Sequence, residues 1–395
     1  MRVCAVICEY NPFHNGHAYH LAQARQASGA DYVLCLMSGA LTQRGTFARH
    51  DKWTRARMAL LSGADVVLEL PTRFSCAPAQ EFAGSGIALL DALGVVTHLS
   101  FGCEPSALPY LSQAAALLSA EPPALRVALR ERLASGMAFP RALAEALQHV
   151  SGVDGLAQLI AQPNAALALE YLRALPAAIL PVPVAREGCG YHDDALGALS
   201  SATAVRAALQ RGDLTGVRDA VPCPDLLEQA ECSGRIHEEE ALTQALLYRL
   251  RTMQAAQLAS INGMDEGLEH RFMRAAQTCQ TRQALIAAIK SKRYTHARLS
   301  RLCAYVLLDM TRTWARENAS PGYARVLGFR RTATPLLSAI QVASRIPLVV
   351  KTADFDRTQP LFALDVRAQD LWALGCHSPL MRASGQDFTT SPVIV

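Results

Sequence analysis

The chain has 395 residues, of which 51% are hydrophobic and 18% are charged, and its formal net charge is +4. This composition excludes an intrinsically disordered chain and allows two folded domains. No apolar run reaches the roughly 18 residues that a membrane span needs, and the first residues read as a strand rather than a leader, so we expect a cytoplasmic protein with no membrane partner. The eleven cysteines form no C-x-x-C pair, which favours small core residues over disulfides.

The first half of the chain alternates short apolar runs with segments of helical length. The apolar runs are 2–8, 32–38, 65–71 and 97–103, and the helical segments between them are 14–29, 51–63 and 76–93. Continuous apolar strands that alternate with helices are typical of a parallel sheet covered on both faces. The pattern therefore predicts a doubly wound α/β fold.

Beyond residue 106 the spacing of apolar residues becomes helical. We expect a helical insertion over 106–171, a further strand over 177–185, and a helix over 200–209 with Ser and Thr at its cap. Nearly everything beyond that helix reads as helical, up to a strand-like run at 344–355. We therefore divide the chain into an α/β domain, residues 1–212, and a mostly helical domain, residues 213–395.

Basic residues gather in one part of the second domain. Between His270 and Arg331 there are thirteen Lys or Arg but only two acids, Asp309 and Glu317, a net charge of +11. Aromatic residues interleave with these cations. So few acids leave little scope for salt bridges, and the mixture favours a nucleic-acid partner over an ordinary solvated helical surface.

Histidines gather where the first predicted strand meets the first predicted helix. His14, Asn15, Gly16, His17 and His20 occupy the start of that helix. A helix N-terminus attracts anions, a glycine lets the backbone approach a ligand closely, and ligands of open parallel sheets bind at this edge. The sequence therefore predicts a phosphate site in which the first two histidines donate hydrogen bonds as charge shifts.

Two other interpretations of the histidines carry less weight. Three histidines at this spacing could bind a metal, but no carboxylate or cysteine follows at ligand distance. A single histidine is more often a satisfied surface or core residue, as we expect for His98 and His149. The chain has neither a G-x-x-x-x-G-K-[ST] motif nor a G-x-G-x-x-G motif that opens a helix, so another device must hold a nucleotide.

Two motifs resemble the signatures of a nucleotidyltransferase superfamily that includes the class I aminoacyl-tRNA synthetases. FHNGH resembles the H-x-G-H signature, and SSATAVR resembles the I-S-S-T-x-I-R signature, with Ala202 where Ser or Thr is common. The resemblance implies a Rossmann-like nucleotidyltransferase domain over 1–212 that binds ATP. It also implies that the signature histidines steady the α-phosphate in the transition state and that the later motif holds the triphosphate tail.

Longer strings, in order along both domains, resemble the bacterial tRNA(Met) cytidine acetate ligases. They are EYNPFHNGHAYHL, SGALTQRGTFA, LPTRFSCAPAQEFA, LSFGCE, QPNAALALEYL, REGCGYHD, KRYTHARLSRL and YARVLGF. The resemblance implies an enzyme that condenses acetate with ATP to acetyl-adenylate and passes the acetyl group to the exocyclic amine of the wobble cytidine of elongator tRNA(Met). The chain departs from the family at Ala40 and Leu41, where the family often has Asn before an aromatic or aliphatic residue.

The motifs and the resemblance together nominate site residues, with His14 and His17 as the catalytic pair. The residues expected to bind ATP are Ile7, Cys8, Glu9, Tyr10, Asn11, Pro12, Phe13, His14, Asn15, Gly16, His17, Ala18, Tyr19, His20, Gly102, Asn164, Arg186, Ser201, Thr203 and Arg206. Arg44 is a further candidate for binding an anion. We expect Mg²⁺ to accompany the triphosphate, although no acidic cluster identifies its ligands.

The basic stretch supplies the residues expected to bind tRNA. Lys292, Arg293, Arg298 and Arg301 are expected to contact phosphates, and Tyr294 is expected to stack on a base. If this stretch is helical, Arg298 and Arg301 are three residues apart and share a face.

Two alternative functions stay open at this point. A small-molecule adenylyltransferase of the pantetheine-phosphate or nicotinamide-nucleotide type would share the N-terminal signatures, but it gives the basic stretch no role. A non-catalytic RNA-binding protein would not need the intact His14, Gly16 and His17.

Overall fold

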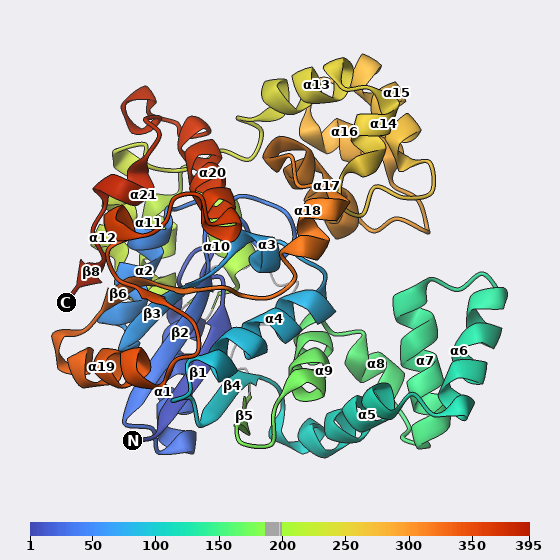
Figure 1. Cartoon of the computed structure of the whole chain (residues 1–395), viewed down its shortest axis with the longest axis horizontal. Helices are drawn as coiled ribbons and strands as arrows, with labels where there is room; N and C mark the ends of the chain where they lie inside the picture. The colour runs from blue at the N-terminus through green and yellow to red at the C-terminus, as the bar shows by residue number, and fades with distance from the viewer. Residues whose placement is uncertain (186–196, 198–199) are drawn as a thin grey trace.

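Eight strands form one sheet in the computed structural model, which describes residues 1–185, 197 and 200–395 (Figure 1). The strand order is β5-β4-β1-β2-β3-β6-β7, and β8 pairs with β6. The strands are β1 (Val3–Cys8), β2 (Tyr32–Ser38), β3 (Val66–Leu70), β4 (His98–Gly102), β5 (Leu180–Val184), β6 (Ala324–Phe329), β7 (Leu348–Val349) and β8 (Val393–Ile394). The pairs among β1 to β5 are parallel, which confirms the fold class predicted for the first half of the chain.

Both faces of the sheet are buried, because alternate residues of a strand enter different cores. Val3 and Ala5 of β1 belong to one core, and Cys4 and Val6 belong to the other. Helices that line the first core include α4 (Ala79–Ala92), α5 (Leu108–Ala120), α9 (Pro163–Ala174) and α19 (Thr334–Ala343). Helices that line the second core include α1 (Asn15–Ser28), α2 (Lys52–Leu61), α10 (Ala202–Gln210) and α12 (Pro224–Cys232).

The predicted helical insertion lies between β4 and β5, from α5 to α9, and projects from the sheet in green in Figure 1. Its other helices are α6 (Pro123–Ala134), α7 (Phe139–Ser151) and α8 (Leu156–Ile160). Short helices α3 (Thr72–Ser75) and α11 (Leu214–Val217) follow β3 and α10.

A second group of helices forms its own core beyond α12. This group, which we call the helical module, contains α13 (Thr243–Thr252), α14 (Ala255–Ser260), α15 (Leu268–Thr278), α16 (Arg282–Ile289), α17 (His296–Leu308) and α18 (Arg312–Glu317). Phe272, Tyr294 and Tyr305 lie in its core. The aromatics that interleave with the cations in sequence are therefore mostly core residues of these helices.

The segment after the helical module returns to the sheet, which the sequence pattern did not predict. Strand β6 pairs antiparallel with β3, and β7 and β8 extend the same edge beyond it. Only Leu348 and Val349 form a strand within the predicted run 344–355. Helices α20 (Pro360–Leu374) and α21 (Gln386–Thr389) complete the chain. The boundary at residue 212 stays a prediction, and strands from both sides of it share one sheet.

A buried cluster of four charges fixes the returning segment to the sheet. Lys52 Nζ lies 2.8 Å from Glu69 Oε1 on β3 and 2.8 Å from Asp387 Oδ1 on α21. Arg325 Nη1 on β6 lies 2.6 Å from Asp387 Oδ1 and 3.1 Å from Glu69 Oε2. All four side chains are at most 2% exposed. Burial alone would raise the pKa of Asp387, but the two cations outweigh it and hold the pKa below its ordinary value.

Removal of Asp387 should destabilise the fold strongly. In Asp387→Ala the cations Lys52 and Arg325 remain buried with one carboxylate between them, and such uncompensated charge typically costs about 3–5 kcal/mol. We expect the free energy of unfolding in urea to fall by that amount. Because the pKa of Asp387 is depressed, its contribution is present above the unfolded pKa and is lost as pH falls through the folded pKa.

The matched control is Asp354→Ala. Asp354 also pairs with a lysine, Lys351 at 3.0 Å, but both side chains are exposed, so the loss should be below about 1 kcal/mol. Equal losses in the two variants would contradict the structural role of the buried cluster.

Candidate active site

Two histidines cap the first helix and hold each other in place. His14 is the N-cap of α1, and its Nδ1 accepts a hydrogen bond from Gly16 N at 3.1 Å. His17 Nδ1 accepts one from His14 N at 3.3 Å, and the centroids of the two rings are 3.7 Å apart. A Cβ on residue 16 would lie 2.9 Å from His14 Cε1, so glycine lets the first ring pack against the turn. The motif FHNGH thus forms a capping box built from imidazoles.

This capping arrangement determines which ring nitrogen can act on a ligand. Because Nδ1 of each ring accepts from a backbone N–H, the ring proton lies on Nε2. An Nε2–H can donate to an oxygen, and the N-terminus of a 14-residue helix adds a partial positive charge. The start of α1 therefore has the chemistry of a phosphate site.

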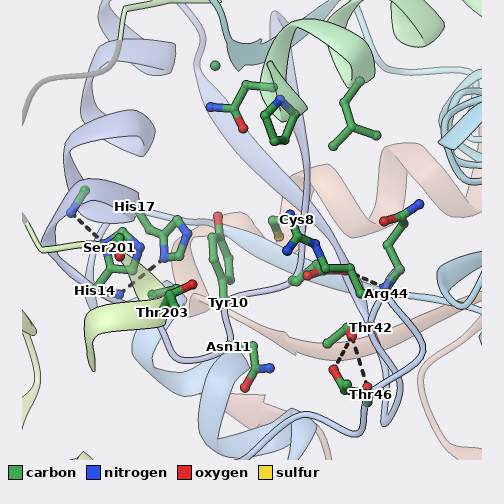
Figure 2. Close-up of a pocket in the computed structure, with 18 of the residues that line it drawn as sticks. Cys8, Tyr10, Asn11, His14, His17, Thr42, Arg44, Thr46, Ser201 and Thr203 are labelled. Atoms are coloured by element: carbon green, nitrogen blue, oxygen red, sulfur yellow. Dashed lines mark hydrogen bonds between the residues drawn. The ribbon is translucent and has the colours of Figure 1, made fainter. Parts of the chain in front are cut away.

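The second sequence motif lies against the first. Ser201 caps α10 and accepts a hydrogen bond from Ala204 N at 3.1 Å. Arg206 donates to the backbone oxygen of Asn11 at 2.5 Å and to Thr203 Oγ1 at 3.1 Å. Figure 2 shows Ser201 and Thr203 next to the two histidines. Residues about 190 positions apart in sequence therefore form one wall of a single site.

A cavity of about 1010 Å³ opens between this wall and the loop that follows β2. Such a volume reaches the upper end of the range usual for small-molecule sites. The predicted residues that line it are Ile7, Cys8, Glu9, Tyr10, Asn11, His14, Gly16, His17, Tyr19, His20, Arg44, Gly102, Asn164, Ser201, Thr203 and Arg206. The end of β1, the start of α1, the end of β4 and the starts of α9 and α10 therefore converge on one space.

Some predicted residues do not line the cavity. Pro12, Phe13, Asn15 and Ala18 lie behind its surface; the Phe13 ring is fully buried, and Asn15 Nδ2 donates to Asp219 O at 2.7 Å. Their side chains support the turn and do not face the cavity. Arg186 lies outside the described residues.

His20 differs from the other two signature histidines. Its Nε2 lies 3.0 Å from Ser100 Oγ on β4, and burial lowers the pKa of its imidazole to about 4. The ring is therefore neutral near pH 7. A neutral imidazole bonded to β4 joins α1 to the sheet and adds no charge to the phosphate site.

The loop 39–50 forms the opposite wall. Glu9, which follows β1, accepts a hydrogen bond from Gln43 N at Oε1, at 2.6 Å. Burial raises the pKa of the Glu9 carboxyl, while Gln43 N–H and nearby arginines oppose the rise. Ala40 and Leu41, where the chain departs from the resembled family, are buried and do not line the cavity. That departure therefore alters the core and leaves the cavity surface unchanged.

The helical module and its approach also line the cavity, which sequence reasoning missed. These residues are His237, Glu239, Thr295, His296, Ala297 and Ser300, joined by Phe47 and Arg49 from the loop 39–50. The string KRYTHARLSRL contains four of them, but the charge pattern predicts only an exposed surface there. The active cavity thus uses both sides of the boundary predicted at residue 212.

Two of the five residues predicted to bind tRNA are structural. Tyr294 is 2% exposed, and its hydroxyl donates to Glu266 Oε2 at 3.2 Å. The guanidinium carbons of Arg271 and Arg298 lie 5.6 and 5.3 Å from the centroid of its ring. The prediction that it stacks on a base is therefore wrong in this structure. Arg301 is also buried, and it donates to Gln43 O at 3.1 Å in the loop 39–50.

The other three residues reach the surface. Lys292 and Arg293 are exposed, and Arg298 is half-buried. Arg293 pairs with Glu266 at 2.6 Å. None of the five lines the cavity.

Residues 1–185, 197 and 200–395 hold neither a clustered metal site nor a membrane-spanning helix. They contain no group of three or more His, Cys, Asp or Glu side chains that could hold a metal ion. None of their helices is long and apolar enough to cross a membrane.

Comparison with known proteins agrees with the geometry. The family model described as HIGH Nucleotidyl Transferase matches residues 1–387. A tRNA(Met) cytidine acetate ligase of Syntrophomonas wolfei is 35% identical over 413 residues, covering 100% of this chain and 99% of the relative. The enzyme of the same name from Acetivibrio thermocellus is also 35% identical, with both chains fully covered.

A solved structure agrees over the same length. Thermotoga maritima TmcAL, crystallised with alpha-thio ATP, superimposes with a TM-score of 0.92 at 31% identity, covering 100% of both chains. The match includes the sheet, the insertion and the helical module. This chain therefore belongs to the tRNA(Met) cytidine acetate ligase family of HIGH nucleotidyltransferases.

Proposed function

We propose that this chain condenses acetate with ATP to acetyl-adenylate and then transfers the acetyl group to the exocyclic amine of the wobble cytidine of elongator tRNA(Met). The observation that carries the proposal is the single cavity that joins the capped start of α1 to residues of the helical module. A small-molecule adenylyltransferase would need only the wall formed by the start of α1 and by α10. Because its substrate is a tRNA, we place the enzyme in the cytoplasm.

In the first step, the α-phosphate of ATP lies at the N-terminus of α1. The Nε2–H groups of His14 and His17 donate to phosphate oxygens as charge develops there, and acetate displaces pyrophosphate in line. Gly102 at the end of β4 lets the adenine approach the backbone, and Asn164 lies nearby on the cavity wall. Ser201, Thr203 and Arg206 face the triphosphate tail. Binding of alpha-thio ATP by the Thermotoga relative supports this use of the cavity.

Mg²⁺ is proposed to accompany the triphosphate. No acidic cluster is found among the described residues, so Mg²⁺ bound by phosphate oxygens and water would accompany the nucleotide. The steps proposed here use only the side chains of the chain and its substrates.

The helical module is proposed to hold the tRNA. Its exposed cations include Arg271, Arg274, Lys290, Lys292 and Arg293, and Arg298 is half-buried beside them. Cations contact phosphates without reading sequence, so they would fix the position of the tRNA while the cavity receives one base. Arg301 and Tyr294 hold the module together beneath this surface.

The histidine pair is tested by His14→Ala and His17→Ala. Each change removes one donor to the transition state, which typically costs about a hundredfold to a thousandfold in rate. We expect acetate-dependent exchange of pyrophosphate into ATP to fall by that factor. His14 is also a helix cap, so His14→Ala should cost about 1 kcal/mol of stability as well, and a thermal melt separates the two effects.

His149→Ala is the control for the histidine pair, because His149 lies exposed on α7 in the insertion. It should exchange pyrophosphate at the wild-type rate. If pyrophosphate exchange stayed near normal in both His14→Ala and His17→Ala, the phosphates would not bind at the start of α1, and the proposed site would be wrong.

The tRNA surface is tested by the double variant Lys292→Glu/Arg293→Glu. It should bind tRNA more weakly, and the slope of log Kd against log salt should fall by roughly 0.7–0.9 for each phosphate that the chain no longer neutralises. Acetate-dependent pyrophosphate exchange should stay at the wild-type rate, because neither residue lines the cavity.

Arg141→Glu provides the control for charge reversal. Arg141 is 76% exposed on α7, outside the helical module. If this variant weakened tRNA binding as much as the double variant did, the tRNA would contact the chain elsewhere, and the proposed surface would be wrong.

A further inference from the structure

Glu9 lies between the two walls of the cavity. It follows Cys8, the last residue of β1, and precedes Tyr10. Figure 2 shows Cys8 and Tyr10 between the histidine pair on one side and Arg44 on the other. Glu9 lines the cavity, its Oε1 accepts from Gln43 N of the loop 39–50, and Arg206 of the opposite wall acts electrostatically on its carboxyl.

A hydrogen bond holds one oxygen of the Glu9 carboxylate. Its Oε1 accepts from Gln43 N at 2.6 Å, and its backbone oxygen accepts from Arg55 Nη1 at 2.7 Å. The Gln43 N–H is donated to Oε1, so Oε2 takes no part in that hydrogen bond. One oxygen is thus fixed while the other is left for a ligand in the cavity that Glu9 lines.

One further carboxylate of the described residues lines the cavity, and it differs from Glu9 in this respect. Glu239 is half-exposed and pairs with Arg282 at 3.0 Å. The Arg282 guanidinium therefore already occupies Oε1 of Glu239. Of the two, Glu9 is therefore the better placed to accept a proton.

The two proposed half-reactions differ in their need for a proton acceptor. Acetate is already ionised when it attacks the α-phosphate, so the first half-reaction releases no proton from the nucleophile. In the second, the exocyclic amine of cytidine attacks the acetyl carbon, a C–N bond forms, and the bond to the AMP oxygen breaks as AMP leaves with the electron pair. The amine must lose one proton in this step.

Resting on the function proposed above, we propose that Glu9 Oε2 accepts the proton of the cytidine amine during acetyl transfer. The carboxylate becomes the neutral acid as the amide forms, and the proton passes to solvent when the product leaves. A carboxylate is a natural partner for the amino group of cytosine. Glu9 is thus a catalytic residue of the second half-reaction.

The proposal predicts a separation of the two half-reactions in Glu9→Gln. Glutamine keeps the size of the side chain and can still accept from Gln43 N, but its amide cannot take up the proton. Loss of a general base typically costs about 10²- to 10⁴-fold. Single-turnover acetylation of tRNA should therefore slow by that factor, while acetate-dependent pyrophosphate exchange should fall less than tenfold.

The pH profile gives a second readout, which a purely structural role would not change. The base must be ionised, so wild-type transfer should rise with pH through the pKa of Glu9, which burial raises above its ordinary value. The groups that face Glu9 are Gln43 N–H and Arg44 of the loop 39–50, Arg55 of α2, Arg206 of α10, Tyr171 of α9 and Cys76 after α3. In Glu9→Gln the rate of acetyl transfer should no longer rise with pH in this range. Glu9→Asp, which keeps a carboxylate, should recover part of the rate of acetyl transfer.

Glu170→Gln is the matched control, because burial also raises the pKa of Glu170 on α9, yet Glu170 does not line the cavity. It should acetylate tRNA within a few fold of the wild-type rate. Transfer by Glu9→Gln at near the wild-type rate, or an equal loss of both half-reactions, would overturn the assignment. A wild-type chain that forms acetyl-adenylate but acetylates no tRNA would instead contradict the proposed function and this role together.

Discussion

One buried guanidinium determines the shape of the cavity. Arg55 on α2 is fully buried, and it donates to the backbone oxygens of Glu9, Ser38, Gly39 and His50. These four oxygens belong to the carboxyl ends of β1 and β2 and to both ends of the loop 39–50. Burial lowers the pKa of Arg55 to about 10, so the group stays charged near pH 7. Without Arg55, the four backbone oxygens would be buried with no hydrogen bond from its guanidinium, which would cost free energy of folding. The hydrogen bonds from Arg55 therefore hold both walls of the cavity in place.

The far side of the loop 39–50 is held by the helical module. Gly45 O accepts from Arg282 Nη2 and from Ser300 Oγ, each at 3.1 Å, and Arg301 Nη1 donates to Gln43 O. Gly45 has a φ of 80°, and a Cβ there would lie 2.4 Å from Arg301 N. Only glycine fits this turn. The module therefore shapes the cavity as well as presenting cations, which explains why two residues of the predicted tRNA surface are buried.

Sequence patterns predicted the sheet of the first half and the start of α1, because strand and helix periodicities are local signals. Strand β6 could not be predicted in this way, since its pairing with β3 joins residues more than 250 positions apart. The burial of Tyr294 and Arg301 was not predicted, for a related reason. A count of charges and aromatics describes a segment, whereas the direction of each side chain depends on what α17 packs against. The string YARVLGF carried the resemblance, yet its strand became apparent only in the folded chain.

The proposed two-step chemistry would explain why both parts of the chain share one cavity. An acetyl-adenylate reacts with water, so its formation next to the acceptor limits loss before transfer. The histidine pair and α10 line one wall of the cavity, which we propose binds the nucleotide, and the loop 39–50 with the start of α17 lines the wall from which we propose that a base enters. Glu9 joins the two walls, and Arg55 holds its backbone. Changes on one wall should therefore affect one half-reaction more than the other, whereas a change at Arg55 moves both walls and cannot separate them.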